Sequence, residues 1–160
     1  MILVTLGTHP KPMNRLVSAL DALLASGDVT DEIIITAAAY DLVPVHATAL
    51  QIQPFAVLDD LAHRADAIVT HGGPASITLA MAAGHLPVVV PRDPAYGEHV
   101  DDHQIRFARW LSKRRPIAVV LEMDALGDAL NAALRRGADS SNKPGVPTEV
   151  IERLRTIIGS

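Results

Sequence analysis

The sequence has no cysteine and few aromatic residues, and each shortage excludes a class of protein. Without cysteine, neither a disulfide framework nor a thiolate metal site can form, which is compatible with a cytosolic location. Phe, Trp and Tyr make up only 3% of the residues, and the formal net charge is −4. Nucleic-acid-binding surfaces typically combine stacking aromatic side chains with positive charge. We therefore expect no nucleic-acid partner.

Long hydrophobic runs are also missing, although 49% of the residues are hydrophobic. No apolar run approaches the ~20 residues of a membrane-spanning helix, so we expect no direct membrane span. The first residues have no basic segment of the kind that opens a signal peptide, and they predict a strand. The 160 residues suit one domain, since domains commonly contain about 100–200 residues. We expect a single domain over 1–160.

Short apolar runs alternate with segments of helical periodicity along the chain. The runs predict strands at 2–6, 32–36, 49–53, 67–70, 87–90 and 117–121. The periodic segments predict helices at 13–25, 56–65, 74–83, 100–112, 124–135 and 147–158, with a surface loop at 137–145. This alternation is typical of an α/β fold with a parallel sheet and right-handed crossovers. We expect a Rossmann-like open parallel sheet of about six strands with helices on both faces.

Ligands of open α/β sheets bind outside the carboxyl ends of the strands. Three of the predicted strands are followed there by Gly7-Thr8-His9, by His71-Gly72-Gly73 and by Pro91-Arg92. At the second of these turns, two glycines precede a helix whose first turn contains Ser76, so a diphosphate could approach backbone N–H groups and the helix dipole. An ordinary strand-to-helix turn with proline near its start is the alternative. Gly7-Thr8 leaves the same two interpretations open, because the spacing of a dinucleotide-binding fingerprint is missing.

A second group of polar residues lies at 97–104, "GEHVDDHQ". His99 and His103 are four residues apart, and with Asp101 and Asp102 they could form a metal site. Acidic residues at a helix start are also typical of capping. In a third interpretation, Glu98, Asp102 and Gln104 hydrogen-bond to sugar hydroxyls at the mouth of a phosphate site.

Three motifs, "HGGPASITLAMAAG", "PVVVPR" and "GEHVDDHQIRFA", resemble the donor-binding half of family 28 glycosyltransferases of GT-B architecture. The likeness is greatest to the small stand-alone type that pairs with a membrane-bound partner. That type includes the donor-binding subunit of the dolichol-linked N-acetylglucosaminyltransferase and similar bacterial exopolysaccharide proteins. The first strand, turn and helix, "ILVTLGTHPKPMNRLV", also resemble the family.

The resemblance implies a set of donor-binding residues at the strand ends. It places the nucleoside diphosphate against Gly7, Thr8, His71, Gly72, Gly73 and Ser76. It places the donor sugar beside Arg92, Glu98, Asp102, His103 and Gln104. Leu79 departs from the family, because many relatives have a Glu there that binds the ribose hydroxyls.

The implied reaction is inverting transfer of a hexose or N-acetylhexosamine from a UDP-sugar to a lipid-linked glycan acceptor, as in exopolysaccharide or glycan biosynthesis. Helix-end N–H groups can stabilise the leaving diphosphate, so we expect no metal and no cofactor besides the donor. A membrane-associated acceptor-binding subunit would complete the hexosyltransferase and hold this chain at the inner face of the membrane. His9 is a candidate base, and an ordinary turn histidine is the alternative. A non-catalytic enhancer subunit and a nucleotide-binding module unrelated to sugar transfer also remain open.

Overall fold

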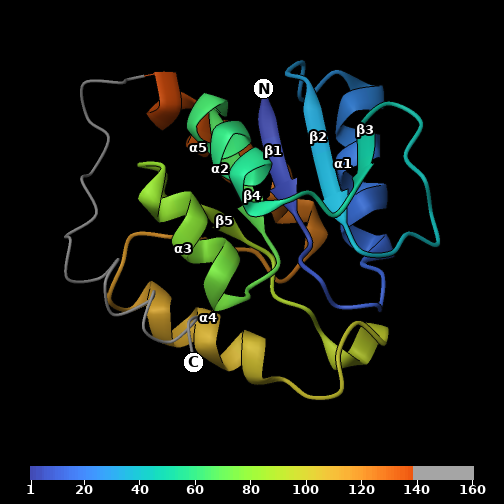
Figure 1. Ribbon diagram of the computed structural model, residues 1–160, viewed down its shortest axis with the longest axis vertical. Coiled ribbons are helices and arrows are strands. Elements are labelled where there is room, and N and C mark those ends of the chain that lie inside the picture. The colour runs from blue at the N-terminus through green and yellow to red at the C-terminus, as the bar shows by residue number, and fades with distance from the viewer. Residues whose placement is uncertain (139–160) are drawn as a thin grey trace.

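The fold is built on one six-stranded sheet in which every neighbouring pair of strands is parallel (Figure 1). The computed structural model describes residues 1–138, so the predicted helix at 147–158 lies outside the described residues. The sheet order is β3-β2-β1-β4-β5-β6. The strands are β1 (Ile2–Thr5), β2 (Ile33–Ala37), β3 (Thr48–Gln51), β4 (Ala67–Thr70), β5 (Val88–Val89) and β6 (Ala118–Val119).

Five α-helices cover the two faces of this sheet among the described residues. They are α1 (Asn14–Ser26), α2 (Phe55–Arg64), α3 (Pro74–Ala82), α4 (His103–Ser112) and α5 (Leu126–Ala138). Two short 3₁₀ helices, η1 (Pro94–Tyr96) and η2 (Met123–Ala125), were not predicted. Residues 137 and 138, predicted as the start of a surface loop, belong to α5, and the rest of the predicted loop at 137–145 lies outside the described residues. No helix within residues 1–138 has both the length and the apolar character that crossing a bilayer requires.

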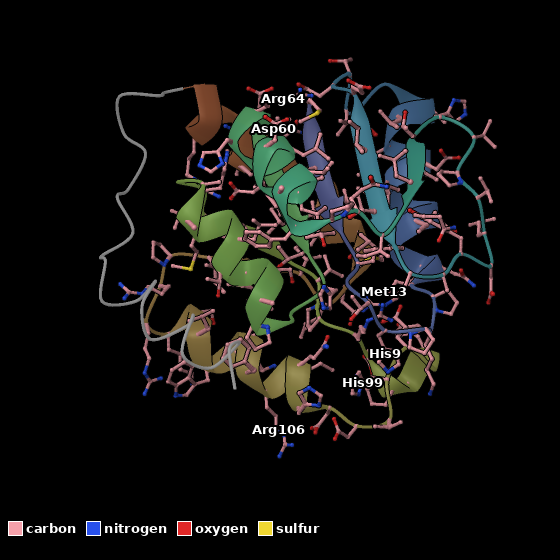
Figure 2. The ribbon with its side chains drawn as sticks, viewed as in Figure 1. His9, Met13, Asp60, Arg64, His99 and Arg106 are labelled. Atoms are coloured by element: carbon pink, nitrogen blue, oxygen red, sulfur yellow. The ribbon has the colours of Figure 1, made fainter. Side chains whose placement is uncertain are left out.

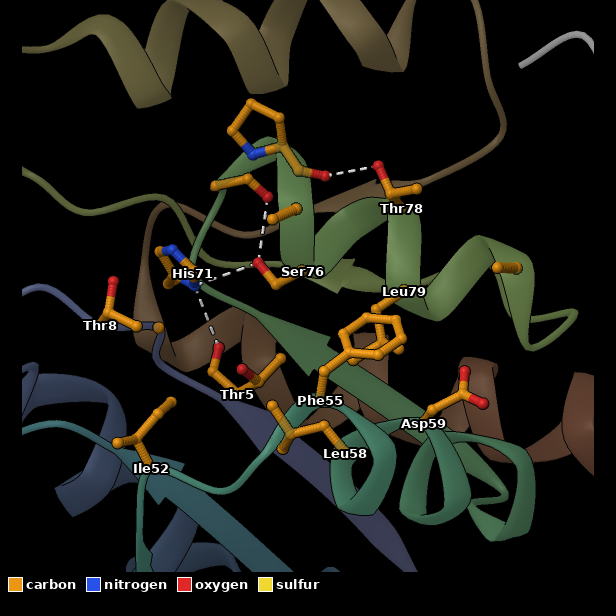
Figure 3. A pocket seen from close by; sticks show the side chains of 15 residues that line it. Thr5, Thr8, Ile52, Phe55, Leu58, Asp59, His71, Ser76, Thr78 and Leu79 are labelled. Carbon is orange, nitrogen blue, oxygen red and sulfur yellow. Dashed lines mark hydrogen bonds between the residues drawn. The ribbon is translucent and has the colours of Figure 1, made fainter. Parts of the chain in front are cut away.

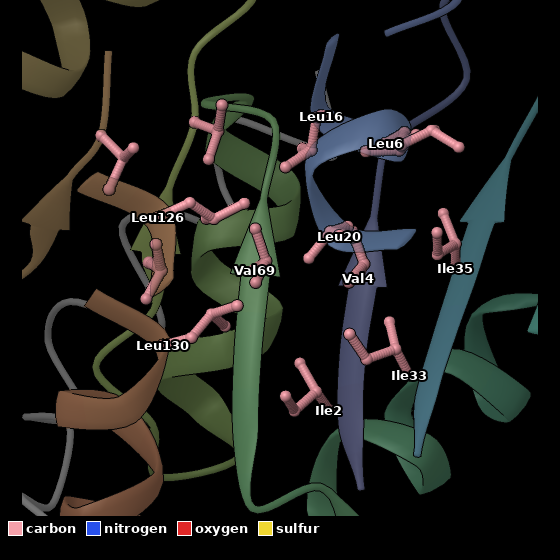
Figure 4. Packing of buried hydrophobic residues seen from close by; sticks show 14 of the residues in the cluster. Ile2, Val4, Leu6, Leu16, Leu20, Ile33, Ile35, Val69, Leu126 and Leu130 are labelled. Carbon is pink, nitrogen blue, oxygen red and sulfur yellow. The ribbon is translucent and has the colours of Figure 1, made fainter. Parts of the chain in front are cut away.

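Side-chain alternation along the strands decides which helices cover which face. Ile2 and Val4 of β1 point to one face, where they pack with Leu16 and Leu20 of α1 and with Leu126 of α5 (Figure 4). The intervening Leu3 belongs to a second cluster, which contains Leu61 of α2 and Leu79 of α3. Helix α4 contributes Ala108 to a third cluster with Ile77 and Met81 of α3. Helices α1 and α5 therefore cover one face, and α2, α3 and α4 cover the other, as expected for strands buried on both sides.

The strand order reverses between β1 and β4, and this reversal positions the site. Chain connections leave β1 toward β2 and β3 on one side, and β4 leads to β5 and β6 on the other. Such a switch point opens a crevice at the carboxyl ends of the two central strands. The turns at Gly7-Thr8 and at His71-Gly72-Gly73 follow these two strands directly. The predicted location of the site at the sheet edge therefore coincides with the switch point.

Helix α3 is unusual because its middle residues are all buried. Residues 76–81 are buried on every side of the helix, so it lacks the polar face of a surface helix. The helix starts at Pro74, with Gly73 at the N-cap position and no side-chain cap. Its first-turn N–H groups therefore donate to no capping side chain at the switch point.

Helix α4 begins at His103, three residues later than predicted. The backbone N–H of His103 donates to Asp101 Oδ1 at 3.0 Å, so the acidic side chain organises the turn before the helix. Such local bonds from Asp side chains compete with helix formation, and residues 97–102 consequently form a loop. The polar group at 97–104 is thus mainly a loop and not a helical face.

Candidate functional site

A pocket of about 700 Å³ opens at the switch point between β1 and β4 (Figure 3). Its walls come from the turn after β1, from the start of α2 with the segment before it, and from the segment that runs from β4 into α3. The lining residues are Thr5, Gly7, Thr8, Ile52, Phe55, Leu58, Asp59, His71, Gly73, Pro74, Ala75, Ser76, Thr78, Leu79 and Ala82. Five of the predicted site residues therefore share one pocket: Gly7, Thr8, His71, Gly73 and Ser76.

The pocket has a polar end and an apolar end. Figure 3 shows Thr8, His71 and Ser76 gathered around the turns after β1 and β4. Phe55 and Leu79 line the other end of the pocket. Phe55 is 73% exposed, so its ring is free to pack against an apolar part of a ligand. Ligand pockets commonly combine such an apolar wall with a few polar groups that fix orientation.

His71 is partly buried and neutral at the polar end of the pocket. Its Nδ1 lies 3.2 Å from the carbonyl oxygen of Thr5 and 3.2 Å from Ser76 Oγ, and the Ser76 hydroxyl donates to the Gly73 carbonyl at 3.0 Å. A carbonyl only accepts, so Nδ1 carries the proton and Nε2 retains its lone pair. Burial lowers the pKa of His71 to about 4, with a further lowering by the charge of Arg92.

Gly7 and Gly73 are glycines because the His71 ring fills the space beside both of them. A Cβ at Gly7 would lie 2.6 Å from His71 Nε2, and a Cβ at Gly73 would collide with the same atom. The sequence analysis expected a ligand to fill the space beside these glycines, whereas in the structure the His71 imidazole fills it. A larger residue at Gly73 would displace His71 before it reached a bound phosphate.

A Cβ at Gly72 would point toward the end of β5, and the predicted position of this residue beside the diphosphate stays a prediction. Its backbone has φ of +81°, and a Cβ would lie 3.0 Å from the Cα of Pro91 and 3.5 Å from the Cβ of Gln104. Glycine tolerates this left-handed conformation without steric cost. Gly72 thus allows the turn after β4 to pass close to the end of β5, and it does not line the pocket.

Arg92 points into the protein, and its predicted sugar contact stays a prediction. The side chain is 1% exposed. Its guanidinium donates to the carbonyl oxygens of Leu6 at 2.8 Å, Lys11 at 2.5 Å and Glu98 at 3.2 Å. These bonds connect the loop after β1 with the loop after β5. Arg92 therefore positions the turn that contains Gly7 and Thr8.

Glu98 is likewise buried, and its partner Arg15 was missed by the sequence interpretation. Glu98 is 2% exposed, and its two carboxylate oxygens accept from Arg15 Nε at 2.9 Å and Nη2 at 3.0 Å. Glu98 Oε2 also accepts from the backbone N–H of Asp93 at 3.0 Å. Arg15 further donates to the carbonyls of Pro91 and Leu121. Glu98 is thus a structural anchor of its loop here, and a sugar contact would require this pairing to open.

Gln104 is also occupied inside the protein. It is mostly buried, and its Oε1 accepts from the backbone N–H of Arg92 at 3.1 Å. Asp102 and His103, in contrast, are exposed, and Asp102 pairs with Arg106 at 3.1 Å. The predicted sugar contacts of these three residues stay predictions, with Asp102 and His103 the two whose side chains are accessible.

His9 lies at the edge of the same opening. Its Nδ1 accepts from the backbone N–H of Lys11 at 3.2 Å, and its ring centroid is 4.9 Å from that of His99. Burial lowers the pKa of His9, and Arg92, His99 and Lys11 lower it further by charge repulsion. A low pKa keeps the imidazole neutral near pH 7, which a general base needs. The assignment of His9 as the base stays a prediction.

The comparisons with known proteins identify the family. Residues 1–149 match the glycosyltransferase family 28 C-terminal domain. The chain belongs to this family. This family 28 domain is 31% identical over 112 residues to the UDP-N-acetylglucosamine–N-acetylmuramyl-(pentapeptide) pyrophosphoryl-undecaprenol N-acetylglucosamine transferase of Alcanivorax borkumensis. The match covers 68% of the chain but only 29% of that relative.

Solved structures confirm the fold of the family 28 domain. The spinosyn forosaminyltransferase SpnP superposes with a TM-score of 0.61 at 17% identity, over 97% of this chain and 39% of that one. Arabidopsis thaliana UGT89C1, solved with UDP-L-rhamnose, gives 0.53 at 15% identity, over 98% and 37% of the two chains. These neighbours are GT-B glycosyltransferases, so the predicted open parallel α/β sheet and its likeness to half of a GT-B protein are confirmed.

Removing the Glu98 carboxylate should unfold the domain much more readily than removing an exposed one. Glu98→Ala leaves Arg15 and Arg92 buried without their counter-charge, and we expect it to lower the free energy of unfolding by about 3–5 kcal/mol. The matched control is Asp60→Ala, which breaks the exposed Asp60–Arg64 pair (Figure 2) and should cost less than about 1 kcal/mol. Urea denaturation measures both, with Glu98→Gln as a milder variant if Glu98→Ala does not fold. Equal losses for Glu98→Ala and Asp60→Ala would contradict the anchor role.

His71 should make the domain sensitive to acid. Between pH 6.5 and about 4, the unfolded chain protonates this histidine while the folded protein does not. The free energy of unfolding should therefore fall as the pH falls, with a His71 contribution of about 2 kcal/mol at about pH 5. His71→Asn, which retains a polar group near Nδ1, should lose less stability between about pH 7 and pH 5. The control His63→Asn, on the surface of α2, should behave as the wild type does. If the free energies of unfolding of the wild type and of His71→Asn changed with pH in parallel, His71 would not be the source of the acid sensitivity.

Proposed function

We propose that the pocket binds the nucleoside diphosphate of a UDP-sugar donor. The observation that carries the proposal is the uncapped start of α3 at the switch point, beside an apolar wall. Helix N-termini attract anions because their N–H groups and dipole present partial positive charge. No acidic residue occupies the first turn of α3. A diphosphate at Gly73–Ser76 would therefore meet unused donors, with Thr8 on the opposite wall.

The apolar end of the pocket suits the nucleobase. Phe55 and Leu79 present apolar surface there, and a volume of about 700 Å³ falls within the range of ligand pockets, ~300–1,000 Å³. A base that lies on Phe55 would exchange exposed aromatic surface for a stacking contact. The family resemblance implies that many relatives have a ribose-binding Glu at the position of Leu79, and the leucine here adds apolar surface to the pocket lining instead.

The proposed activity is the donor half of an inverting hexosyltransferase that acts on a lipid-linked acceptor. Support comes from family membership and from the name of the Alcanivorax borkumensis relative, which acts on a pyrophosphoryl-undecaprenol acceptor. The chain spans about 29% of that relative. We therefore propose that acceptor binding is supplied from outside these residues, by a membrane-associated subunit that places this domain at the cytoplasmic face of the membrane. The role in exopolysaccharide or glycan biosynthesis is part of the same proposal.

UDP should bind to the wild-type protein and raise its melting temperature, because a ligand selective for the native state stabilises it. Phe55→Ala should weaken UDP binding by about tenfold or more, since loss of an aromatic contact to a base costs about 1–3 kcal/mol. Val57→Ala, on the same helix but outside the pocket lining, serves as the control and should keep the wild-type affinity. Isothermal titration calorimetry measures all three proteins. Absence of UDP binding to the wild type would overturn the donor-site proposal, and equal affinities would overturn the position of the base.

Sugar transfer should require the acceptor subunit. An active site between two halves orients the acceptor hydroxyl and excludes water, and such orientation can lower a barrier by several kcal/mol. Purified chain, candidate partner membranes and their mixture can be compared for transfer from radiolabelled UDP-sugars to lipid. We expect transfer only in the mixture. Transfer by the chain alone would contradict the two-subunit proposal, and activity of the membranes alone that this chain merely increases would favour the enhancer role.

A further inference from the structure

Three histidine rings and one carboxylate gather beside the mouth of the pocket. Figure 2 shows His9 and His99 next to each other at one edge of the protein. The ring centroids of His9 and His99 are 4.9 Å apart, and those of His99 and His103 are 4.6 Å apart. Asp101 lies between the last two, with its Oδ1 at 2.5 Å from His103 Nδ1 and 3.6 Å from His99 Nδ1. None of these four side chains lines the pocket.

We propose that His99, Asp101 and His103 bind a divalent transition-metal ion of the zinc class. One ligand atom from each of these residues lies within 4.8 Å of the others. Two imidazole nitrogens and a carboxylate oxygen are ligands that zinc prefers, and around a tetrahedral ion with bonds of about 2.0–2.2 Å they would be about 3.4 Å apart. The His99–Asp101 separation already has this size. Coordination would replace the closer His103–Asp101 hydrogen bond.

The backbone holds the three ligands in place before any ion binds. The N–H of His103 donates to Asp101 Oδ1, which fixes the carboxylate beside the start of α4. One residue before His99, Glu98 is anchored inside the protein by Arg15. The ligand loop is therefore attached to rigid structure at both ends, and less conformational entropy is lost on binding than for a free loop. His103 and Asp101 are half exposed, so the ion can enter from solvent.

The charges around the cluster permit a cation. The Asp101 carboxylate, which is 55% exposed, supplies the negative charge of the cluster. Arg92 and Lys11 place positive charge near His9, and the Glu98 carboxylate offsets the charge of Arg92. Arg106 is paired with Asp102. His9, in the loop after β1, contacts the His99 ring. An ion bound in the loop of His99 and Asp101 would therefore also lie close to the loop after β1.

The test uses the full chain without an affinity tag, stripped of metal with EDTA and then dialysed. Calorimetric titration should show one equivalent of Zn²⁺ bound and no comparable binding of Mg²⁺, which prefers oxygen ligands and retains its waters. The double variant His99→Ala/His103→Ala should weaken Zn²⁺ binding at least tenfold. The matched control His46→Ala/His63→Ala also removes two surface histidines and should keep the wild-type affinity. No Zn²⁺ binding to the wild type, or equal weakening in both double variants, would overturn the proposal.

Two further measurements separate this site from the donor pocket. Co²⁺ in place of Zn²⁺ should give the intense visible absorption of a tetrahedral ion, and Asp101→Asn should change that spectrum. EDTA should leave the UDP affinity of the wild type within about twofold, less than ~0.5 kcal/mol, because the ligands lie outside the pocket lining. An unchanged Co²⁺ spectrum in Asp101→Asn would refute Asp101 as a ligand. Loss of UDP binding with EDTA would refute the separation of the two sites, whereas failure of Zn²⁺ binding would leave the donor proposal standing.

Discussion

A buried ionic network at the carboxyl ends of the strands determines the shape of the loops that border the pocket. Arg15 reaches from α1 to the carboxylate of Glu98 and to the ends of β5 and β6, while Arg92 reaches back to the carbonyls after β1. Each guanidinium is removed from water, so the many hydrogen bonds to carbonyls and one carboxylate must offset a large desolvation cost. Once these hydrogen bonds form, few conformations remain open to the two loops. The loops after β1 and β5 therefore keep fixed positions relative to each other.

The pocket depends on this rigidity because the His71 ring must fit between the turn after β1 and Gly73 of its own turn. The imidazole lies against Gly7 and Gly73, in contact with the ends of both central strands, and its Nδ1 is committed to Thr5 and Ser76. A small shift of the turn after β1 would either close this space or release the ring. The start of α3 is consequently held open toward solvent with its N–H groups uncapped. Preorganised donors of this kind bind an anion without further reorganisation, which favours both affinity and leaving-group stabilisation.

The fold and the polar half of the site could be predicted from the sequence, whereas the roles of the buried charges could not. Parallel strands buried on both faces produce continuous apolar runs, and glycines mark the turns after β1 and β4, so the strand ends that border the pocket could be predicted from local patterns. The strand order that brings these two ends together came only from the structure. Arg15 and Glu98 are 83 residues apart in the sequence. A Glu that binds an Arg cannot be told from a Glu that binds a sugar by residue type alone. Phe55 directly follows Pro54 and lies shortly after the end of β3, so the sequence alone could have placed it near the carboxyl ends of the strands. Its pairing with Leu79, however, depends on how α2 packs against α3.

The central claim is that the uncapped start of α3 and the turn after β1 together bind a nucleoside diphosphate. Amide chemical shifts of the ¹⁵N-labelled protein, recorded while UDP is added, test it most directly because they report each backbone N–H separately. The account predicts saturable shifts at Gly7, Thr8, Gly73 and Ser76, with smaller changes around Phe55. Saturable shifts confined to α5, or to any surface away from the switch point, would contradict it.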